Sequence, residues 1–384
     1  MMVKLGDVCE KKIETVKTTY TGKIDYIDIS SVDNQRKEIT QTQSMLFEDA
    51  PSRAKQQVFP GDILVSTVRP NLNAVALITE HSDNILVAST GYCVLRCLPN
   101  VHTKYIFYFC QSPAFIEKLV MQAAGASYPA VTSNIVKECV IPLPPLTEQR
   151  KIAAVLDKVS DLIAKRRQQL DKLDLLIKAR FVEMFGVYPA NPMGWEIGTI
   201  RDIVTEVRYG SSRPAVDGGK YPYLRMNNIT YGGELDLSDT KRIDIPDNEL
   251  EKCTVRRGDV LFNRTNSKEL VGKTCVYDRD EMMVLAGFVI RIRVTDRVLP
   301  EFLSAFLNTD FSKQMLFGMC KTAIGQANIN AKELQSIGLY LPPVELQRGF
   351  VQFKKGNEKS KLAIQKGLEK LEMLKKALMQ EYFG

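Results

Sequence analysis

The chain has 384 residues, of which 45% are hydrophobic and 25% charged, so it is long enough for two domains of about 150 residues each. It contains no run near the roughly 20 apolar residues that a membrane helix needs, and no signal peptide follows the first methionines. We therefore expect a cytoplasmic protein, whose net charge of +7 permits a polyanionic partner without requiring one.

The eight cysteines and two histidines do not favour a zinc site. No two cysteines have the C-x-x-C spacing, and the closest pair, Cys93 and Cys97, lies in a run that is typical of a β-strand. We expect the thiols to be small buried side chains, and we expect no metal or other cofactor in this chain.

The chain repeats itself once, at an offset that stays between 196 and 198 residues. The landmarks recur in the same order: YIDISSV and YLRMNNI, GDILVS and GDVLFN, YCVLR and FVIRI, LPPLTEQR and LPPVELQR, and a closing Phe-Gly. Matched landmarks in a constant order indicate a tandem duplication.

Each copy begins with a stretch typical of β-strands, rich in β-branched and aromatic residues and interrupted by Gly, Asn and Pro turns. A short helical segment is expected next, at 105–120 in the first copy and at 302–317 in the second. A loop and a final strand follow, and a Pro-Pro pair then forces extended backbone before a long helix. The chain thus divides into two globular regions, 1–145 and 187–343, each followed by a helix, 146–186 and 344–384.

Both long helices carry a heptad seam of mainly apolar residues, which is typical of helices that pack on a partner helix. Because the seams lie at equivalent points of the repeat, we expect the two helices to pack on each other; packing of each helix on its own domain alone is the alternative. A helix of about 36 residues is about 54 Å long, more than one turn of B-DNA at about 34 Å. The seam residues are Ile152, Leu156, Val159, Ile163, Leu170, Leu173 and Ile177, and Phe350, Phe353, Ile364, Leu371, Leu374 and Leu378.

Two stretches resemble enzyme motifs only in part. Residues 191–195, Asn-Pro-Met-Gly-Trp, are similar to the Asn-Pro-Pro-aromatic motif of amino-methyltransferases, but the second proline is missing and no glycine-rich cofactor loop lies upstream. We interpret them as a turn that opens the second copy. Residues 272–274, Gly-Lys-Thr, are similar to the end of a phosphate-binding loop, but Ser267 stands where the first glycine is needed. With no other hydrolase or transferase motif, we expect no catalytic residue.

Polar loops in both copies hold side chains that contact nucleic acid well. Arginine favours guanine edges, asparagine favours adenine, and lysine and serine often contact phosphates. The loops differ between the copies while the surrounding strands are alike, which suits an asymmetric, bipartite target; a solvated loop is the alternative for each residue. The candidates in the first copy are Ser66, Thr67, Arg69, Asn71, Asn73, Ser127 and Tyr128. Those in the second are Arg208, Tyr209, Ser211, Arg213, Asn227, Asn228, Arg264, Asn266, Lys268, Gln326 and Asn328.

The order of GDIL, a glycine-centred loop, I-x-LPPLTEQR-x-I and a long helix ending in Phe-Gly, repeated once, resembles the specificity (S) subunits of type I restriction-modification systems. The resemblance covers essentially residues 3–384, and LPPLTEQRKIAAVLD is its most specific stretch. The second copy departs from it in LPPVELQR, where Leu346-Gln347 replaces the Glu-Gln pair.

This resemblance implies an α+β fold with two mixed α/β target-recognition domains, related as a pseudo-twofold tandem repeat, each reading half of a gapped DNA sequence. It implies that the two long helices form an antiparallel coiled-coil spacer. The implied partners are double-stranded DNA, two methyltransferase (M) subunits and restriction (R) motor subunits, with no membrane. S-adenosylmethionine, ATP and Mg would belong to those partners. A stand-alone DNA enzyme and a coiled-coil scaffold with two protein- or ligand-binding modules are the alternative functions.

Overall fold

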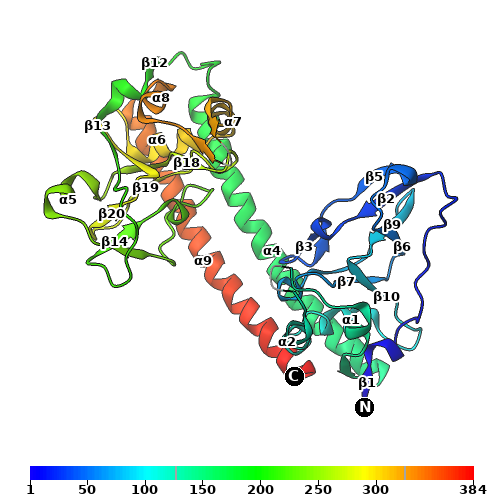
Figure 1. Ribbon diagram of the computed structural model, residues 1–384. Coiled ribbons are helices and arrows are strands. Elements are labelled where there is room, and N and C mark those ends of the chain that lie inside the picture. Colours follow the sequence, from blue (N-terminus) through cyan, green and yellow to red (C-terminus); the bar gives the residue numbers. More distant parts are fainter. Residues whose placement is uncertain (126–127, 324–325) are drawn as a thin grey trace. The chain divides into compact units, whose positions relative to one another are not determined.

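Both copies of the repeat fold as mixed α/β domains in the computed structural model (Figure 1). The structure describes residues 1–125, 128–323 and 326–384. A long helix follows each domain, α4 (Leu146–Phe185) after the first and α9 (Val344–Phe383) after the second. The chain divides into two compact units, Met1–Leu170 with Ala363–Gly384 and Asp171–Leu362. Each unit therefore contains one domain and a part of both long helices.

The first domain combines short strands with short helices. Its strands are β1 (Met2–Lys4), β2 (Lys23–Ile27), β3 (Val32–Asp33), β4 (Glu38–Ile39), β5 (Gln43–Leu46), β6 (Ala54–Gln57), β7 (Ile63–Ser66), β8 (Val75–Leu77), β9 (Ile85–Ser89), β10 (Tyr92–Leu95) and β11 (Val140–Pro142). Its helices are α1 (Thr103–Phe109), α2 (Pro113–Gln122) and α3 (Ser133–Lys137). The main sheets have the orders β10-β7-β8 and β5-β2-β9-β6, with β2 and β9 parallel, and β1 pairs with β11.

The second domain repeats this plan. Its strands are β12 (Glu196–Thr199), β13 (Val204–Tyr209), β14 (Tyr221–Leu224), β15 (Lys241–Ile243), β16 (Thr254–Val255), β17 (Val260–Asn263), β18 (Thr265–Asn266), β19 (Thr274–Val276), β20 (Met283–Leu285), β21 (Val289–Val294), β22 (Lys321–Ala323), β23 (Gln326–Asn328) and β24 (Gly338–Leu341). Its helices are α5 (Asp247–Cys253), α6 (Pro300–Leu307), α7 (Asp310–Met319) and α8 (Ala331–Gln335). The sheets β13-β21-β17-β19 and β15-β14-β20-β16, with β14 and β20 parallel, match those of the first domain, and β12 pairs with β24.

The short helical segment expected in each copy is two helices, α1 and α2 in the first and α6 and α7 in the second. The second helix of each pair starts at a capping side chain: Ser112 accepts a hydrogen bond from the backbone N–H of Phe115, and Thr309 accepts one from that of Ser312. Pro113 follows the first cap, and a proline at the first helical position suits a new helix start. A cap inside the segment thus divides it.

A Gly-Asp turn precedes the equivalent strand in both domains, β7 in the first and β17 in the second. Its glycine is left-handed in both copies, with φ of +96° and +92°. The aspartate is buried, and Arg96 Nε donates to Asp62 while Arg293 Nε donates to Asp259, each at 2.8 Å. A buried carboxylate is stable only when it is paired, so this ion pair links the turn to the neighbouring strand.

A phenylalanine at the end of each long helix closes a domain core. In the second unit Phe185 of α4 packs on Phe302 of α6, with ring centroids 4.9 Å apart. In the first unit Phe383 of α9 packs on Tyr105 and Phe109 of α1, at 5.2 and 5.8 Å. Figure 1 shows α1 and α2 beside the first part of α4 and the end of α9. The last residues of the chain therefore complete the core of the first domain.

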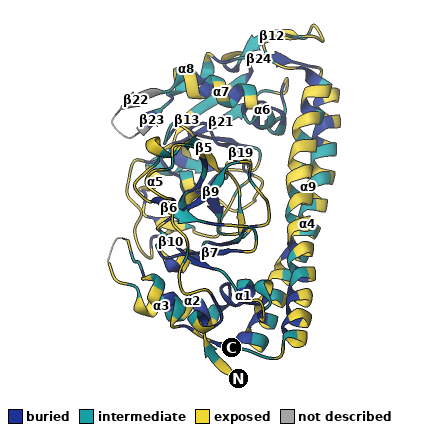
Figure 2. Ribbon diagram, turned by 90° about the vertical axis from the view of Figure 1, so that its right-hand side faces the viewer, coloured by how far each residue is buried: buried dark blue, intermediate teal, exposed yellow. Residues whose placement is uncertain are grey.

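Most of the predicted seam residues are buried or half-buried, and α4 and α9 pack on each other. In the first unit these residues are Ile152, Leu156, Val159, Ile163, Leu170, Ile364, Leu371 and Leu378. In the second they are Leu173, Ile177, Phe350 and Phe353. Val159 and Ile163 of α4 share a buried cluster with Leu368 of α9, and Phe181 of α4 packs edge-on against Phe350. The opposite sides of both helices are exposed (Figure 2).

We expected Leu374 in the seam, but it does not lie there, because it is 47% exposed. Lys375 takes the inner position: its Nζ donates to Gln111 Oε1 at 3.3 Å and lies 5.4 Å from the ring centre of Tyr108. Burial lowers the pKa of Lys375 to about 8, and the nearby guanidinium of Arg167 acts in the same direction. Lys375 thus faces Tyr108 and Gln111 of the domain, one position after the leucine that the heptad pattern alone places inside.

A buried glutamine joins the start of each long helix to its domain. Gln149 accepts a hydrogen bond from the backbone N–H of His102 at 2.9 Å and donates to the carbonyl of Pro144 at 2.8 Å. Gln347 accepts from Leu299 and donates to Pro342, both at 2.8 Å. The glutamine in LPPLTEQR and LPPVELQR is therefore structural.

We predict that Gln347→Leu lowers the free energy of unfolding by about 2 kcal/mol or more, because it leaves the N–H of Leu299 and the carbonyl of Pro342 without this partner. Arg348→Gln, at the exposed neighbouring position, should change stability by less than about 0.5 kcal/mol. Urea unfolding followed by circular dichroism measures both. Equal stabilities of the two variants would contradict the assignment.

We predict that Lys375→Met changes how stability depends on pH. An unfolded lysine titrates near about 10.4, whereas the folded pKa is about 8, so between these values the unfolded chain binds more protons. Wild-type stability should therefore rise relative to the variant from pH 8 to 10, by up to about 3 kcal/mol. Urea unfolding at several pH values tests this, with the exposed Lys376→Met as control. Parallel curves for wild type and Lys375→Met would refute the prediction.

Candidate nucleic-acid interface

The loop after β7 or β17 meets the loop before α3 or α8 in the same way in both domains. In the first domain Thr67 N–H donates to Gly91, and the carbonyl of Thr67 accepts from Val131. In the second, Arg264 makes the corresponding bonds to Phe288 and Ile329. The backbone therefore aligns Thr67 with Arg264. We call these junctions the first tip (residues 66–73 and 128–131) and the second tip (residues 263–268 and 326–329).

Three candidates of the first tip are buried, and their side chains bond within the domain. Ser66 Oγ donates to the carbonyl of Val68, and Thr67 Oγ1 donates to that of Gly91, both at 2.9 Å. Asn73 Nδ2 donates to the carbonyl of Cys110 at 2.8 Å. These groups shape the loop, because their hydrogen-bonding atoms are already used inside it.

The exposed candidates of the first tip are Arg69, Asn71 and Tyr128, whereas Ser127 lies outside the described residues. The guanidinium of Arg69 lies over the ring of Tyr128, 4.4 Å from its centre. Arg69 also donates its backbone N–H to Pro129 at 2.7 Å and is left-handed, with φ of +49°. The fold thus brings together two candidates from separate loops.

In the second domain, Ser211 and Asn228 are buried. Ser211 accepts a hydrogen bond from Arg213 N–H at 3.2 Å, and Asn228 Nδ2 donates to the carbonyl of Asp236 at 2.8 Å. They therefore hold loops in place.

The exposed candidates outside the second tip are Arg208, Arg213, Asn227 and Tyr209. Both arginines already have carboxylate partners: Arg208 lies 3.6 Å from Glu206, and Arg213 lies 2.8 Å from Glu249. Their charges are therefore partly neutralised within the domain.

The second tip is a small sheet. β18 pairs with β23, which places Thr265 opposite Asn328 and Asn266 opposite Ala327. Arg264 lies 4.8 Å from the ring centre of Tyr209, and Lys268 Nζ lies 4.2 Å from that of Phe317. The strand pairing thus brings the segment with Asn266 beside the segment with Asn328, and Tyr209 of β13 meets Arg264.

An unpaired polar cluster underlies the second tip. Asn263 is wholly buried, and neither atom of its amide has a hydrogen-bond partner among the described residues. The same holds for the hydroxyl of Thr265 and for the side-chain oxygen of Asn328. In the first tip Ser66 stands in the place of Asn263 and is internally bonded. This difference between GDILVS and GDVLFN was the sequence signal for the cluster.

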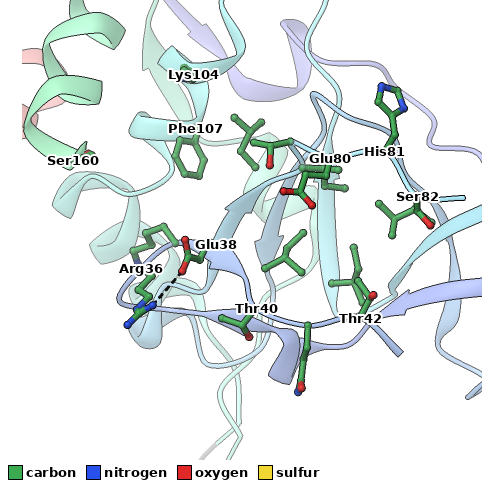
Figure 3. Close-up of a pocket in the computed structure, with 18 of the residues that line it drawn as sticks. Arg36, Glu38, Thr40, Thr42, Glu80, His81, Ser82, Lys104, Phe107 and Ser160 are labelled. Atoms are coloured by element: carbon green, nitrogen blue, oxygen red, sulfur yellow. Dashed lines mark ion pairs between the residues drawn. The ribbon is translucent and has the colours of Figure 1, made fainter. Parts of the chain in front are cut away.

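A hollow of about 840 Å³ lies in the first unit, between the strands of the domain, α1, α4 and α9. Figure 3 shows Arg36 and Glu38 on one side of the hollow and Lys104 and Phe107 on another. Arg36 and Glu38 form an ion pair, with an N–O distance of 3.8 Å. The rim also carries Glu80, so acidic and basic groups are mixed. The hollow therefore has no clear preference for an anionic ligand. Sequence reasoning missed it, because its walls come from segments far apart in the chain.

In the first unit an arginine links the domain to both helices. Arg167 of α4 donates to the carbonyl of Gln35 at 2.9 Å and pairs with Glu372 of α9 at 2.7 Å. Gln35 belongs to the turn between β3 and β4. One cation thus positions this turn on the helix pair.

A lysine makes the analogous link in the second unit. Lys361 of α9 pairs with Asp174 of α4 at 2.7 Å and with Glu234 of the domain at 2.6 Å. Burial lowers the pKa of Lys361, but the bonds to the two carboxylates more than offset it, so this pKa is raised. Asp174 and Glu372 occupy equivalent positions of the repeat. Both domains are therefore positioned by the same kind of three-part link.

The two stretches that resemble enzyme motifs have structural roles. Asn191 bonds the backbone of Trp195 through both ends of its amide, which confirms the predicted turn. Lys273 donates to the carbonyl of Met226 at 2.8 Å, and Thr274 begins strand β19 rather than a helix. Among the described residues no group of side chains is arranged to hold a metal ion. In the same part of the chain, no helix is long and apolar enough to cross a membrane.

Comparison with known proteins identifies the family. The type I restriction modification DNA specificity domain matches residues 1–174 and 192–372. The specificity subunit of the type I restriction enzyme EcoKI from Escherichia coli (strain K12) is 25% identical over 348 residues, covering 86% of this chain and 75% of that protein.

Solved structures agree with this match. A chain from a structure that addresses complex assembly and conformational transition of a type I restriction-modification system has a TM-score of 0.59 at 25% identity, covering 100% of this chain and 97% of that one. A type I S subunit from M. genitalium shares the fold, with a TM-score of 0.52 at 14% identity over 100% of this chain and 96% of that one. The chain belongs to the type I restriction-modification specificity subunits, which are DNA-recognition rather than catalytic components, and it contains two tandem target-recognition domains.

Proposed function

We propose that each target-recognition domain reads one half of a gapped, bipartite DNA sequence through its tip. The observation that carries this proposal is that both tips have the same backbone hydrogen bonds but different exposed side chains. Base edges in the major groove are distinguished by the pattern of donors and acceptors that side chains offer. Two similar frames with different polar groups are thus suited to two different half-sites.

Burial separates the residues that would contact DNA from those that shape the loops. The proposed contacts in the first domain are Arg69, Asn71 and Tyr128. Those in the second are Arg264, Asn266, Lys268 and Asn328 of the tip, together with the exposed Arg208, Tyr209, Arg213 and Asn227 outside it. Ser66, Thr67, Asn73, Ser211 and Asn228 are buried and internally bonded, so we assign them to loop shape rather than to base contact.

We further propose that α4 and α9 form an antiparallel coiled-coil spacer whose outer surfaces dock two methyltransferase subunits. Both helices expose large apolar side chains although their seam is filled, and such patches suit a protein partner. Leu175-Leu176 and Met373-Leu374 are exposed at equivalent positions of the repeat, which supports two copies of one partner. S-adenosylmethionine, ATP and Mg would act in the M and R subunits, and the complex would work in the cytoplasm.

We predict that replacing residues 195–330 with those of another specificity subunit changes one half of the methylated motif and leaves the other half unchanged. The reason is that these residues contain the second tip but none of the first. Methylation mapping of DNA from cells that express the chimera with its methyltransferase measures the motif, and the unaltered chain serves as control. A change in both halves would contradict the proposal. Failure of the unaltered complex to bind any DNA in a gel-shift assay would favour the scaffold alternative.

We predict that Met373→Lys with Leu374→Lys weakens binding of one methyltransferase subunit by about tenfold or more, because charges replace apolar side chains at the proposed interface. Lys370→Ala, at an exposed polar position of the same helix, is the matched control. Size-exclusion chromatography with light scattering counts the bound subunits, and circular dichroism verifies the helix. Unchanged stoichiometry and affinity would rule out docking at this pair.

A further inference from the structure

We propose that Arg69 and Arg264 are the guanine-reading side chains of the two tips, each held in a reading position by a tyrosine ring. This inference rests on the proposed function, because it names the base that each tip selects. Arginine is suited to guanine because its planar fork donates two parallel hydrogen bonds to O6 and N7 in the major groove.

Neither Arg69 nor Arg264 forms an ion pair with a carboxylate among the described residues. Other arginines of the second domain do so: Arg213 with Glu249 at 2.8 Å, Arg225 with Asp239 at 2.9 Å and Arg293 with Asp259 at 2.8 Å. A guanidinium on a carboxylate has its charge and part of its donor edge already used. Arg69 and Arg264 keep theirs for a ligand.

An aromatic ring orients each of these two guanidinium groups. Arg69 lies 4.4 Å from the ring centre of Tyr128, and Arg264 lies 4.8 Å from that of Tyr209. The two tyrosines are 67% and 43% exposed, so each pair reaches the surface. Stacking restricts the rotamers of arginine before binding, and less side-chain freedom is then lost in the complex.

A backbone hydrogen bond also holds one member of each pair in place. Pro129 accepts the N–H of Arg69, which places that arginine next to the residue that follows Tyr128. Tyr209 accepts a hydrogen bond from Ala331 N–H at 2.8 Å through its hydroxyl, which anchors the ring to the start of α8.

The two pairs are not inherited from the duplication. The hydrogen-bond alignment places Thr67, not Arg69, at the position of Arg264. Tyr128 comes from the loop before α3, whereas Tyr209 ends β13. The two copies therefore reach the same arrangement from different positions, which points to a shared task at both tips.

The experiment uses the complex of the full chain with its methyltransferase and maps the methylated motif for Arg69→Lys and Arg264→Lys. Lysine keeps the charge but cannot form the two-pronged bond. We expect each variant to lose discrimination at one G·C position, by about tenfold or more, in one half of the motif only. Arg264→Lys should affect the half that changes when residues 195–330 are replaced. Arg257→Lys, an arginine paired with Asp280 at 2.7 Å, is the control that keeps the motif.

The tyrosines provide a second readout. Tyr128→Phe keeps the ring and should keep the motif and the methylation rate, whereas Tyr128→Leu should lower the rate at cognate sites without changing thermal stability. A wild-type motif with no G·C pair in one half, or an Arg264→Lys motif identical to that of wild type, would overturn the inference. A uniform loss of methylation at all sequences would also overturn it, because that result indicates a phosphate contact. In each of these cases an intact bipartite wild-type motif leaves the proposed function standing, whereas an undivided motif would refute that function first.

Discussion

Phe185 and Phe383 anchor the two long helices by packing into the domain cores. Each ring ends a long helix and lies among aromatic residues of a short helix, Phe302 in one unit and Tyr105 with Phe109 in the other. Because aromatic pairs bury large areas and prefer definite angles, they fix where each long helix ends. The C-terminal residues thereby belong to the first unit, and each helix contributes to both units. The packing thus ties each long helix to the cores of both units.

A few polar links attach each domain, and with it its tip, to the long helices. Buried glutamines join the helix starts to the domains, and Arg167 and Lys361 attach one turn of each domain to the helix pair. A polar link of this kind is favourable only in a definite geometry, because a buried donor or acceptor without its partner is costly. The loops are then free to differ between the copies while their supports stay alike.

The residues near a tip divide into two classes that composition cannot separate. Asn73 and Asn71 are the same residue type two positions apart, yet Asn73 is buried with its amide bonded to Cys110 and Asn71 is exposed. Arg213 and Arg264 are both candidates of the second domain, but only Arg213 has a carboxylate partner among the described residues. A buried side chain whose bonds are already made shapes the loop, whereas one that reaches the surface is available to DNA, and a carboxylate partner lowers the charge that it can offer.

The sequence by itself determined the duplication, the strand-rich domains and the two long helices, because repeated landmarks and heptad spacing are local properties of the chain. It also indicated which loops carry polar side chains. Tertiary structure alone decided that Lys375 rather than Leu374 faces inward, that a capping residue divides the short helical segment, and that Arg69 meets Tyr128. These outcomes depend on which distant segments become neighbours, and a heptad or a loop composition contains no information about its neighbours. The partners of Arg264 and Asn73 were undetermined for the same reason: burial and pairing arise only when the fold is complete.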